Sequence, residues 1–224
     1  MARRFDGSNH SVWRTTDLPA WDACTLMAWA YISVDRAADS YIFQWCNASS
    51  TNGSYCGINS TRQLFVEENT NRTTGSTLAV GTWYHIAMAT GPSNVTVYLN
   101  GVQDAQRASG TFTPAFLQWG GGTGFLNGNV SALKAFTVEM TATQITQEMR
   151  SVRPLGGSVH GFWPSILHTD LEDLSGTGRT LTLNGTQLTE DGPPVGWGAT
   201  PYVIRNPAAG PGGRNPVSMG FDLR

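Results

Sequence analysis

Pairs of acidic residues are the first place to look for chemistry, because glycoside hydrolysis needs two carboxyl groups that face the scissile bond. Glu67 and Glu68 are adjacent, so on a strand their side chains point to opposite faces. Asp170 and Glu172 have a spacing that suits one strand face, but the surrounding stretch HTDLEDLSG is typical of a loop. Neither pair predicts a hydrolytic centre, and we expect no enzymatic activity.

Nucleophile, phosphate-loop and metal motifs are also missing from the sequence. The stretch GGSVHG lacks the Gly-x-Ser-x-Gly arrangement that exposes a serine nucleophile. The run GGGTG at 120–124 is not followed by Gly-Lys-Ser/Thr, so it predicts a sharp turn rather than a phosphate loop. The four histidines have no metal-ligand spacing with the three cysteines. We therefore expect no cofactor, apart from the calcium considered below.

The composition excludes two kinds of partner. The 224 residues carry a net charge of -2, so no long-range positive field attracts nucleic acid or an anionic membrane. No run approaches the roughly 18 apolar residues of a membrane span, and we expect no membrane insertion. The N-terminal stretch MARRFDGSNHSVW has no apolar core after its arginines, so we expect no secretory signal.

Two of the cysteines could pair. Cys46 and Cys56 flank the stretch NASSTNGSY, and a hairpin could bring them together. A disulfide would need oxidising conditions, which a chain without a secretory signal does not normally meet. The alternative, which we favour, is three buried thiols that behave as small apolar side chains.

The side chains that could bind a ligand must be positioned by strands, and residues 81–101, GTWYHIAMATGPSNVTVYLNG, predict a hairpin. Strand side chains alternate between faces. The even-numbered loop places an aliphatic set on one face, consisting of Tyr84, Ile86, Met88, Val95, Val97 and Leu99. The opposite face carries aromatic and polar groups. One buried face is typical of a strand pair inside a sandwich.

Further strand-like segments with turn signals between them recur along the chain. We expect them at 10–13, 25–33, 40–46, 55–60, 63–68, 76–80, 102–109, 116–120 and 129–138, with two more at 161–164 and 179–185.

One helix is expected. Thr141 with Gln144 three residues later forms a capping-box pattern, Ile145 and Met149 could pack as one stripe, and Pro154 prevents continuation.

These segments resemble the laminin-G-like domains of the concanavalin A-like lectin/glucanase superfamily. The hairpin is similar to their central Trp, His, turn and Tyr-x-Asn-Gly pattern. Three other stretches also resemble the family and occur in the expected order over residues 3–153: RRFDGSNHSVW, CTLMAWAYIS and FLNGNVSALKAFTVEMTATQITQEM. TDLEDLSGTGRTLTLNGT resembles a phrase that is common beside such domains. The family position of His85 implies a buried, hydrogen-bonded role for this residue.

The resemblance implies an all-β fold, a two-sheet antiparallel jelly-roll sandwich with one short helix. We assign residues 1–191 to this sandwich, with its core at 3–153, and residues 192–224 to an extended Gly/Pro-rich C-terminal arm. Such a segment would be extended or mobile by itself. We expect that either a neighbouring subunit or its own domain holds it. Members of the superfamily bind glycans or proteins, cleave polysaccharides or serve as structural modules, so the fold does not settle the function.

Two kinds of site follow from the resemblance. Exposed aromatic rings and amides could bind a glycan, and the candidates are Trp83, Tyr98, Asn100 and Trp119. The alternative is that these large rings fill the space between the sheets. Calcium could be held by oxygen ligands near turns, and the candidates are Asn100, Asp104 and Asn127. The Glu-x-Asp-x-x-Glu pattern of the superfamily's hydrolases is not found.

We therefore interpret the chain as a non-catalytic binding or structural module. Its abrupt start, the lack of an export signal and the Gly/Pro-rich arm favour a virion-associated protein, such as a bacteriophage capsid-decoration or tail subunit. In that setting the arm would contact other protein subunits, the location would be the virion surface, and glycan adhesion could be an added role. The first alternative is a soluble or cell-surface carbohydrate-binding lectin module, with an extracellular or cell-surface location. The second is a polysaccharide-cleaving enzyme.

Overall fold

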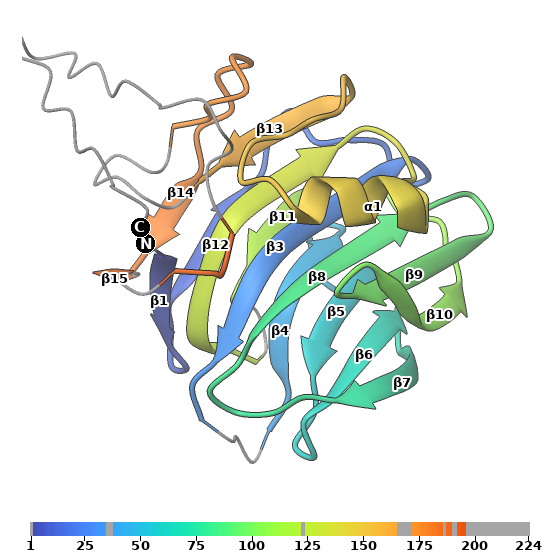
Figure 1. The fold of residues 1–224 in the computed structure, drawn as a ribbon. Helices are drawn as coiled ribbons and strands as arrows, with labels where there is room; N and C mark the ends of the chain where they lie inside the picture. The colour runs from blue at the N-terminus through green and yellow to red at the C-terminus, as the bar shows by residue number, and fades with distance from the viewer. Residues whose placement is uncertain are drawn as a thin grey trace, which may run out of the picture.

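The structure, a computed structural model, describes residues 2–34, 38–121, 124–164, 172–185, 187–189 and 192–195. Asp170 and almost all of the expected C-terminal arm lie outside these residues. The elements are β1 Ala2–Asp6, β2 Ser11–Arg14, β3 Cys24–Ile32, β4 Ser40–Cys46, β5 Gly53–Ile58, β6 Gln63–Glu68, β7 Asn71–Thr77, β8 Trp83–Thr90, β9 Asn94–Leu99, β10 Val102–Ala108, β11 Phe116–Trp119, β12 Asn127–Phe136, α1 Ala142–Met149, β13 Val159–Trp163, β14 Thr182–Asn184 and β15 Gln187–Thr189 (Figure 1).

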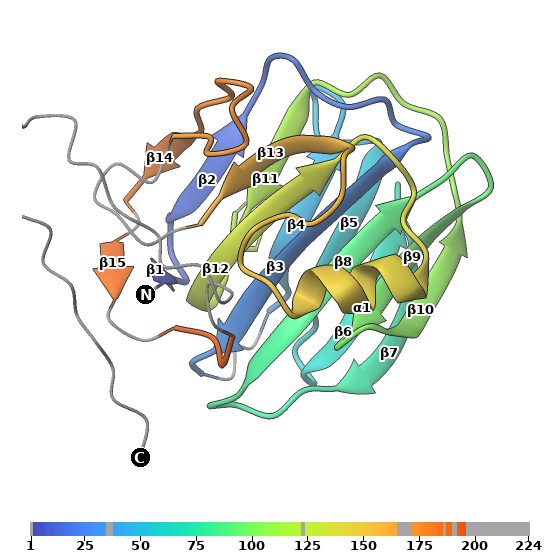
Figure 2. The same ribbon diagram turned by 45° about the horizontal axis from the view of Figure 1, so that its top comes forward.

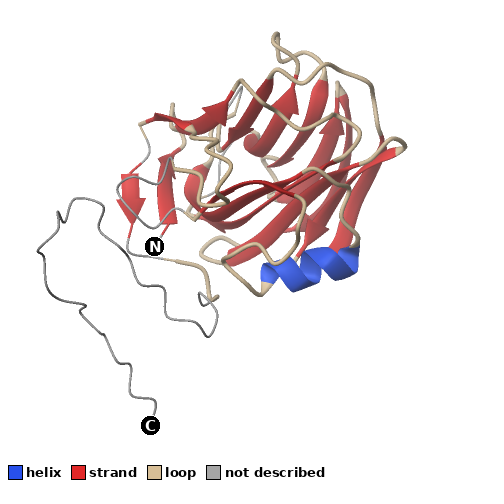
Figure 3. Cartoon of the chain, turned by 90° about the horizontal axis from the view of Figure 1, so that it is seen from above, coloured by secondary structure: helices blue, strands red, loops and turns tan. Residues whose placement is uncertain are grey.

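The strands form two antiparallel sheets, which confirms the predicted sandwich. The helix-side sheet has the order β10-β9-β8-β3-β12-β1-β15, with β13 also paired to β12. The open sheet has the order β14-β2-β11-β4-β5-β6-β7. Figure 3 shows the two sheets as layers, with α1 on the outer side of one layer. Only the helix-side sheet is covered by a helix among the described elements, so the outer face of the open sheet is free of one.

The core lies between the two sheets and follows from side-chain alternation. The aliphatic face of the hairpin β8–β9 is buried as predicted, because Met88 lies opposite Val97 and Ile86 lies opposite Leu99. The hairpin β9–β10 closes through Asn100 and Gly101, which both have positive φ angles (52° and 83°). Two positive φ values are the requirement of a tight two-residue turn, which Asn-Gly satisfies with little strain.

The helix has the capping box that the sequence predicts. The Thr141 side chain accepts a hydrogen bond from the Gln144 backbone N–H, and the Gln144 side chain accepts one from the Thr141 N–H. Ile145 is buried in a small cluster with Ala87, Ala89 and other side chains on the outer face of the helix-side sheet. Met149 packs in the neighbouring cluster around Trp29. The outer face of the hairpin is therefore the platform on which α1 rests.

The chain after the helix belongs to the sandwich. β13 extends the helix-side sheet beside β12, and β14 extends the open sheet beside β2 (Figure 2). β15 pairs with β1. Of the expected arm, only residues 192–195 are described, and Val195 packs against the cluster around Trp29.

One expected strand is misplaced. We predicted a strand at 76–80, but β7 spans Asn71–Thr77 and Leu78 beyond it is a core residue. β7 is an edge strand of exposed and half-buried polar residues. Such a strand carries no apolar alternation for a sequence pattern to detect, and its pairing with β6 places it.

The disulfide hypothesis is wrong, and the thiol alternative is confirmed, since all three cysteines are free and buried. Cys46 lies opposite Gly53 and Cys56 lies opposite Phe43. Cys56 points into the core between the sheets, whereas Cys46 belongs to a cluster on the outer face of the open sheet. Two thiols on opposite faces of a sheet cannot meet the geometry of a disulfide.

Candidate functional site

A continuous row of outward side chains crosses the open sheet. Each residue of the row lies directly opposite the next one on the neighbouring strand. The order is Thr182, Trp13, Gln118, Gln44, Tyr55, Glu67 and Arg72. Their chain neighbours Val12, Phe43 and Cys56 belong to the core cluster, so the row itself faces outward. We call these residues the cross-strand row.

The middle of the cross-strand row forms the floor of a hollow with a volume of about 540 Å³. Its lining consists of Tyr41, Gln44, Ser50, Thr51, Tyr55, Glu67, Asn69, Thr70, Phe116 and Gln118. Three of these side chains are aromatic and three are amides. A hollow that combines aromatic rings with hydrogen-bonding groups is suited to a small-molecule ligand.

Two carboxamides in the floor have no hydrogen-bond partner. The Gln44 side chain is 4% exposed and the Gln118 side chain is 6% exposed, and neither forms a side-chain hydrogen bond with any described residue. Neither amide is among the fully buried polar atoms that lack a hydrogen-bond partner, so both amides reach the solvent of the hollow that they line. The hollow therefore presents two NH2 groups that can donate and two amide oxygens that can accept hydrogen bonds from a ligand.

Tyr55 is one of the three aromatic residues that line the hollow. Gly57 lies two residues further along the strand, where a Cβ would overlap the Ser40 carbonyl oxygen and the ring of Phe65, so this glycine makes room for Phe65. The Tyr55 hydroxyl donates a hydrogen bond to the Ser50 carbonyl (3.0 Å). Burial raises the pKa of the Tyr55 hydroxyl, so this group stays protonated. Its hydrogen bond to Ser50 holds the ring in position.

The acidic group of the hollow is neutralised by an arginine. Arg72 Nε and Nη2 donate to Glu67 Oε2 at 2.8 and 2.5 Å, and Arg72 Nη1 lies 2.7 Å from Asp39 Oδ2. The same guanidinium lies 3.8 Å above the centre of the Phe65 ring, an arrangement that adds cation–π attraction. Glu68 points the other way and accepts from Ser54 Oγ and Gly110 N. The expectation that the adjacent acids face opposite sides is confirmed.

The rim of the hollow is built from two asparagine-stabilised loops. Asn47 Oδ1 accepts from the backbone N–H groups of Thr51 and Asn52 (3.1 and 3.3 Å). Asn69 Oδ1 accepts from the Gly53 N–H (3.0 Å). Side-chain to backbone bonds of this kind hold short loops in one shape, so the wall at this end of the hollow is preorganised.

The four glycan candidates predicted from the sequence do not form this site. Trp119 is 0% exposed and packs edge-on against Trp163 between the sheets, with ring centres 5.3 Å apart. Tyr98 is buried beneath α1. The alternative that large rings fill the space between the sheets agrees with the position of Trp119, whereas Tyr98 packs under α1 on the outer face of the helix-side sheet.

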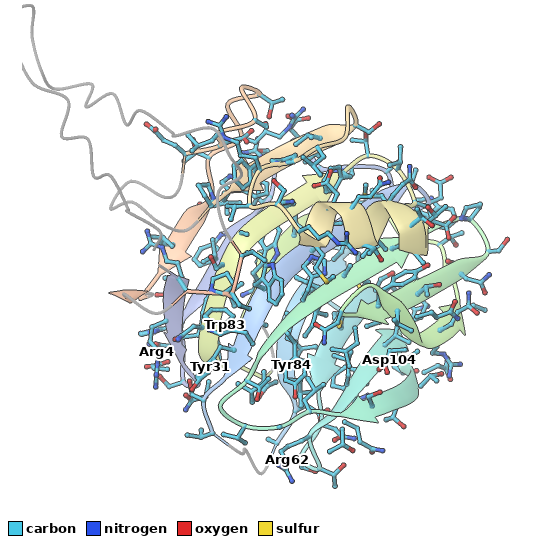
Figure 4. All side chains as sticks on the ribbon, in the orientation of Figure 1. Arg4, Tyr31, Arg62, Trp83, Tyr84 and Asp104 are labelled. Atoms are coloured by element: carbon cyan, nitrogen blue, oxygen red, sulfur yellow. The ribbon has the colours of Figure 1, made fainter. Side chains whose placement is uncertain are left out.

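The other two candidates lie on the outer face of the helix-side sheet. Trp83 is half-buried beside Tyr31, with ring centres 5.5 Å apart (Figure 4). Asn100 Oδ1 accepts a hydrogen bond from the His85 N–H (2.9 Å), so Asn100 closes the turn. His85 is buried as expected, although its Nδ1 has no partner among the described residues.

The three calcium candidates are not brought together. Asp104 lies on β10 and its carboxylate accepts from the backbone N–H and the hydroxyl of Ser76. Asn127 accepts a hydrogen bond from Arg4, and Arg4 lies on the far side of the molecule from Asp104 (Figure 4). Asn100 is used in its turn. Four strand spacings separate β10 from β12, or roughly 19 Å, so these residues form no common site. Among the described residues, no group of three His, Cys, Asp or Glu side chains could hold a metal ion.

Sequence reasoning missed the residues of the hollow, although a signal was present. In SYCG and FLQW, the lining residues Tyr55, Phe116 and Gln118 alternate with core residues. In YIFQWC, the lining residues Tyr41 and Gln44 are three apart, because the strand has a register shift between Tyr41 and Phe43. Alternation within a segment does not show that the faces of distant segments meet.

The two stacked sheets and the ring-lined hollow define an antiparallel β-sandwich with a ligand-sized surface on its open sheet. The chain belongs to the concanavalin A-like lectin/glucanases superfamily, whose profile matches residues 5–146. No curated protein compared with the chain matches it. None of the described helices is long and apolar enough to cross a membrane.

Solved structures with the same fold have low sequence identity. A Bacteroides ovatus protein described as a candidate carbohydrate binding protein is 18% identical, with a TM-score of 0.69 over 88% of this chain and 62% of its own. The chain thus spans less than two thirds of that protein. A SAP-like pentraxin from Limulus polyphemus is 17% identical, with a TM-score of 0.54 over 66% of this chain and 81% of its own. These likenesses show the fold.

Proposed function

We propose that the chain is a carbohydrate-binding module and that its glycan occupies the hollow of the open sheet. The observation that carries this proposal is the pair of buried, unpartnered carboxamides of Gln44 and Gln118 in a ring-lined floor. Sugar hydroxyl groups both donate and accept hydrogen bonds, and an amide offers both functions. The apolar faces of sugar rings can pack against the aromatic rings of Tyr41 and Phe116.

The charges of the hollow support binding without catalysis. Hydrolysis would need one carboxylic acid and one free carboxylate across the bond to be cleaved. Glu67 is the one acid in the lining, and Arg72 holds its carboxylate in two hydrogen bonds. The lining therefore lacks the second carboxyl group that hydrolysis needs. The description of the Bacteroides ovatus neighbour as a candidate carbohydrate binding protein agrees with this proposal.

A glycan array followed by isothermal titration calorimetry tests the function. Wild-type chain is compared with Gln44→Leu and Gln118→Leu, which keep the side-chain size and remove the amide. Gln103→Leu on the exposed face of β10 is the matched control. We expect saturable binding that falls at least tenfold in the two hollow variants and stays unchanged in the control. Absence of binding to any glycan, or equal binding by all four proteins, would refute the proposal.

The setting in which the module acts is a separate proposal. The sequence favours a virion surface, with residues 192–224 as contacts to other subunits, and a soluble or cell-surface lectin is the alternative. The copy number of this chain in purified particles separates the two, because a decoration protein is present in a fixed ratio to the capsid protein and a soluble lectin is absent.

A further inference from the structure

We propose that the ligand is a linear, uncharged glycan that crosses the strands of the open sheet along the cross-strand row, with Trp13 as an outlying stacking position. This inference rests on the carbohydrate binding proposed above. It adds the shape and charge of the ligand and assigns a role to a residue outside the hollow.

Trp13 is placed for this role by the register of β2. It lies directly opposite Gln118, so it is the next outward side chain after the hollow. Its neighbour Val12 belongs to the core, whereas Trp13 is half-buried and belongs to none of the core clusters among the described residues. Beyond it on β14 is the exposed residue Thr182. A half-exposed indole in line with a ring-lined hollow offers a flat face for a further sugar ring.

The dimensions of the row suit a chain of several sugars. From Trp13 on β2 to Arg72 on β7 the row crosses five strand spacings, or about 24 Å at ~4.8 Å per strand. A single sugar would cover only the part of this distance that lies over Gln118, Gln44 and Tyr55. The unpartnered amides and Trp13 are on adjoining strands, so a chain that contacts both amides also reaches the indole.

The direction of the chain follows from the rim. Ser50 and Thr51 from the β4–β5 loop, and Asn69 and Thr70 from the β6–β7 loop, line the hollow. Each of these hairpin loops joins the ends of its two strands. The two loops lie at the same edge of the sheet, because Cys46 is opposite Gly53 and the next residue, Ser54, is opposite Glu68. A chain that ran parallel to the strands would meet this wall. A chain that runs across them lies beside it.

The charges favour a neutral ligand. The lining of the hollow holds one carboxylate, Glu67, and no cationic side chain. The nearby cation, Arg72, is shared between Glu67 and Asp39, so two negative charges face one positive charge. The carboxylate of a uronic acid would therefore meet a site without a free positive partner and would be disfavoured. Amides and a tyrosine hydroxyl match the hydroxyl groups of neutral sugars instead.

Titration with oligosaccharides of increasing length tests the inference. The probes are cello-, xylo-, manno- and malto-oligosaccharides of one to six residues, with oligogalacturonates of the same lengths as the charged series. We expect the affinity for one neutral series to rise at least tenfold between two and five residues. In Trp13→Ala that rise is lost, while the affinity for the shortest ligand that binds is unchanged. Trp83→Ala, a half-buried tryptophan of the helix-side sheet, is the matched control and should behave as wild type.

The outcomes separate the two proposals. If no oligosaccharide binds, carbohydrate binding itself fails, and the inference with it. If short neutral ligands bind without any gain from length, or if Trp13→Ala weakens short and long ligands equally, the extended site is wrong while carbohydrate binding stands. Tighter binding of oligogalacturonates than of every neutral series would overturn the assignment of charge.

Discussion

Gln44 on β4 and Gln118 on β11 lie directly opposite each other in the open sheet. Both side chains are nearly buried, and the structure gives neither amide a hydrogen-bond partner among the described residues. The two residues are 74 positions apart in the sequence. Both amides line the hollow, and a ligand that fills it would form hydrogen bonds with them in place of solvent.

This relationship predicts that the two amides matter for binding and little for stability. Gln44→Leu and Gln118→Leu replace an amide that forms no hydrogen bond with the described residues and faces the hollow, so each variant should lie within about 1 kcal/mol of wild type in the free energy of unfolding. Urea unfolding followed by tryptophan fluorescence measures the change. A loss of more than about 1 kcal/mol in both variants would show that the amides are satisfied in the free protein, for example by ordered water.

Gly121 is predicted to position one of these amides. A Cβ at this residue would overlap the Gln118 amide nitrogen and the Cβ of Ser11. Gly121→Ala should therefore displace the Gln118 side chain and weaken glycan binding at least tenfold, because the amide leaves the floor of the hollow. Gly157→Ala is the matched control, since a Cβ there meets nothing within 4 Å. Unchanged binding by Gly121→Ala in calorimetry would argue against a role for the Gln118 amide.

The single lysine of the chain should be important for stability. Lys134 is 2% exposed, and its Nζ donates to Glu148 Oε2 and to the carbonyl groups of Glu148 and Ser151, each at 2.8 Å. It thus ties the C-terminal end of α1 to β12. Lys134→Met leaves the Glu148 carboxylate buried without its cation, and we expect a loss of about 3–5 kcal/mol in the free energy of unfolding.

The control for this prediction is Arg150→Met, which removes an exposed cation at the end of the same helix. It should change stability by less than about 0.5 kcal/mol. Similar losses in the two variants would mean that the buried pair has no special role.

Two buried histidines predict a loss of stability in mild acid. Burial and, secondarily, the positive charge of Lys134 lower the pKa of His85 to about 3. Burial is also the main reason that the pKa of His160 is lowered to about 4. An unfolded histidine has a pKa near 6.5, so below that pH the unfolded state binds protons that the folded state does not. Stability from these residues is fully present above about pH 6.5 and is lost as the pH falls toward 3–4.

Between pH 7 and pH 5, His85 alone should contribute a loss of about 2 kcal/mol. Unfolding curves at several pH values measure how steeply the free energy of unfolding changes with pH. This slope should be shallower for His85→Gln than for wild type, whatever the absolute stability of the variant. An equal slope in both proteins would show that His85 does not stay neutral in the folded state.

The cysteines should be free but unreactive. Burial raises the pKa of the Cys24, Cys46 and Cys56 thiols, so neither access nor thiolate formation favours reaction. A thiol reagent added without reductant should find three thiols per chain in denaturant and almost none in the native protein. A count of one thiol per chain in denaturant would show that the other two cysteines form a disulfide.

The sequence by itself determined the local features of this protein. Alternation predicted the hairpin β8–β9 and its buried face, Thr141 and Gln144 predicted the helix start, and the adjacency of Glu67 and Glu68 showed that they face opposite ways. Each of these depends on residues a few positions apart, whose relative geometry is fixed by the period of a strand or a helix.

The tertiary structure decided which outward faces meet. Trp13, Gln118, Gln44 and Tyr55 form one row only because β2, β11, β4 and β5 pair in one register, and a shift of one residue in any pair would turn that strand's side chains to the other face. Register between strands so distant in the sequence is set by the packing of the whole core. For the same reason Trp119 lies between the sheets and Cys46 and Cys56 lie on opposite faces, which no spacing along the chain could show.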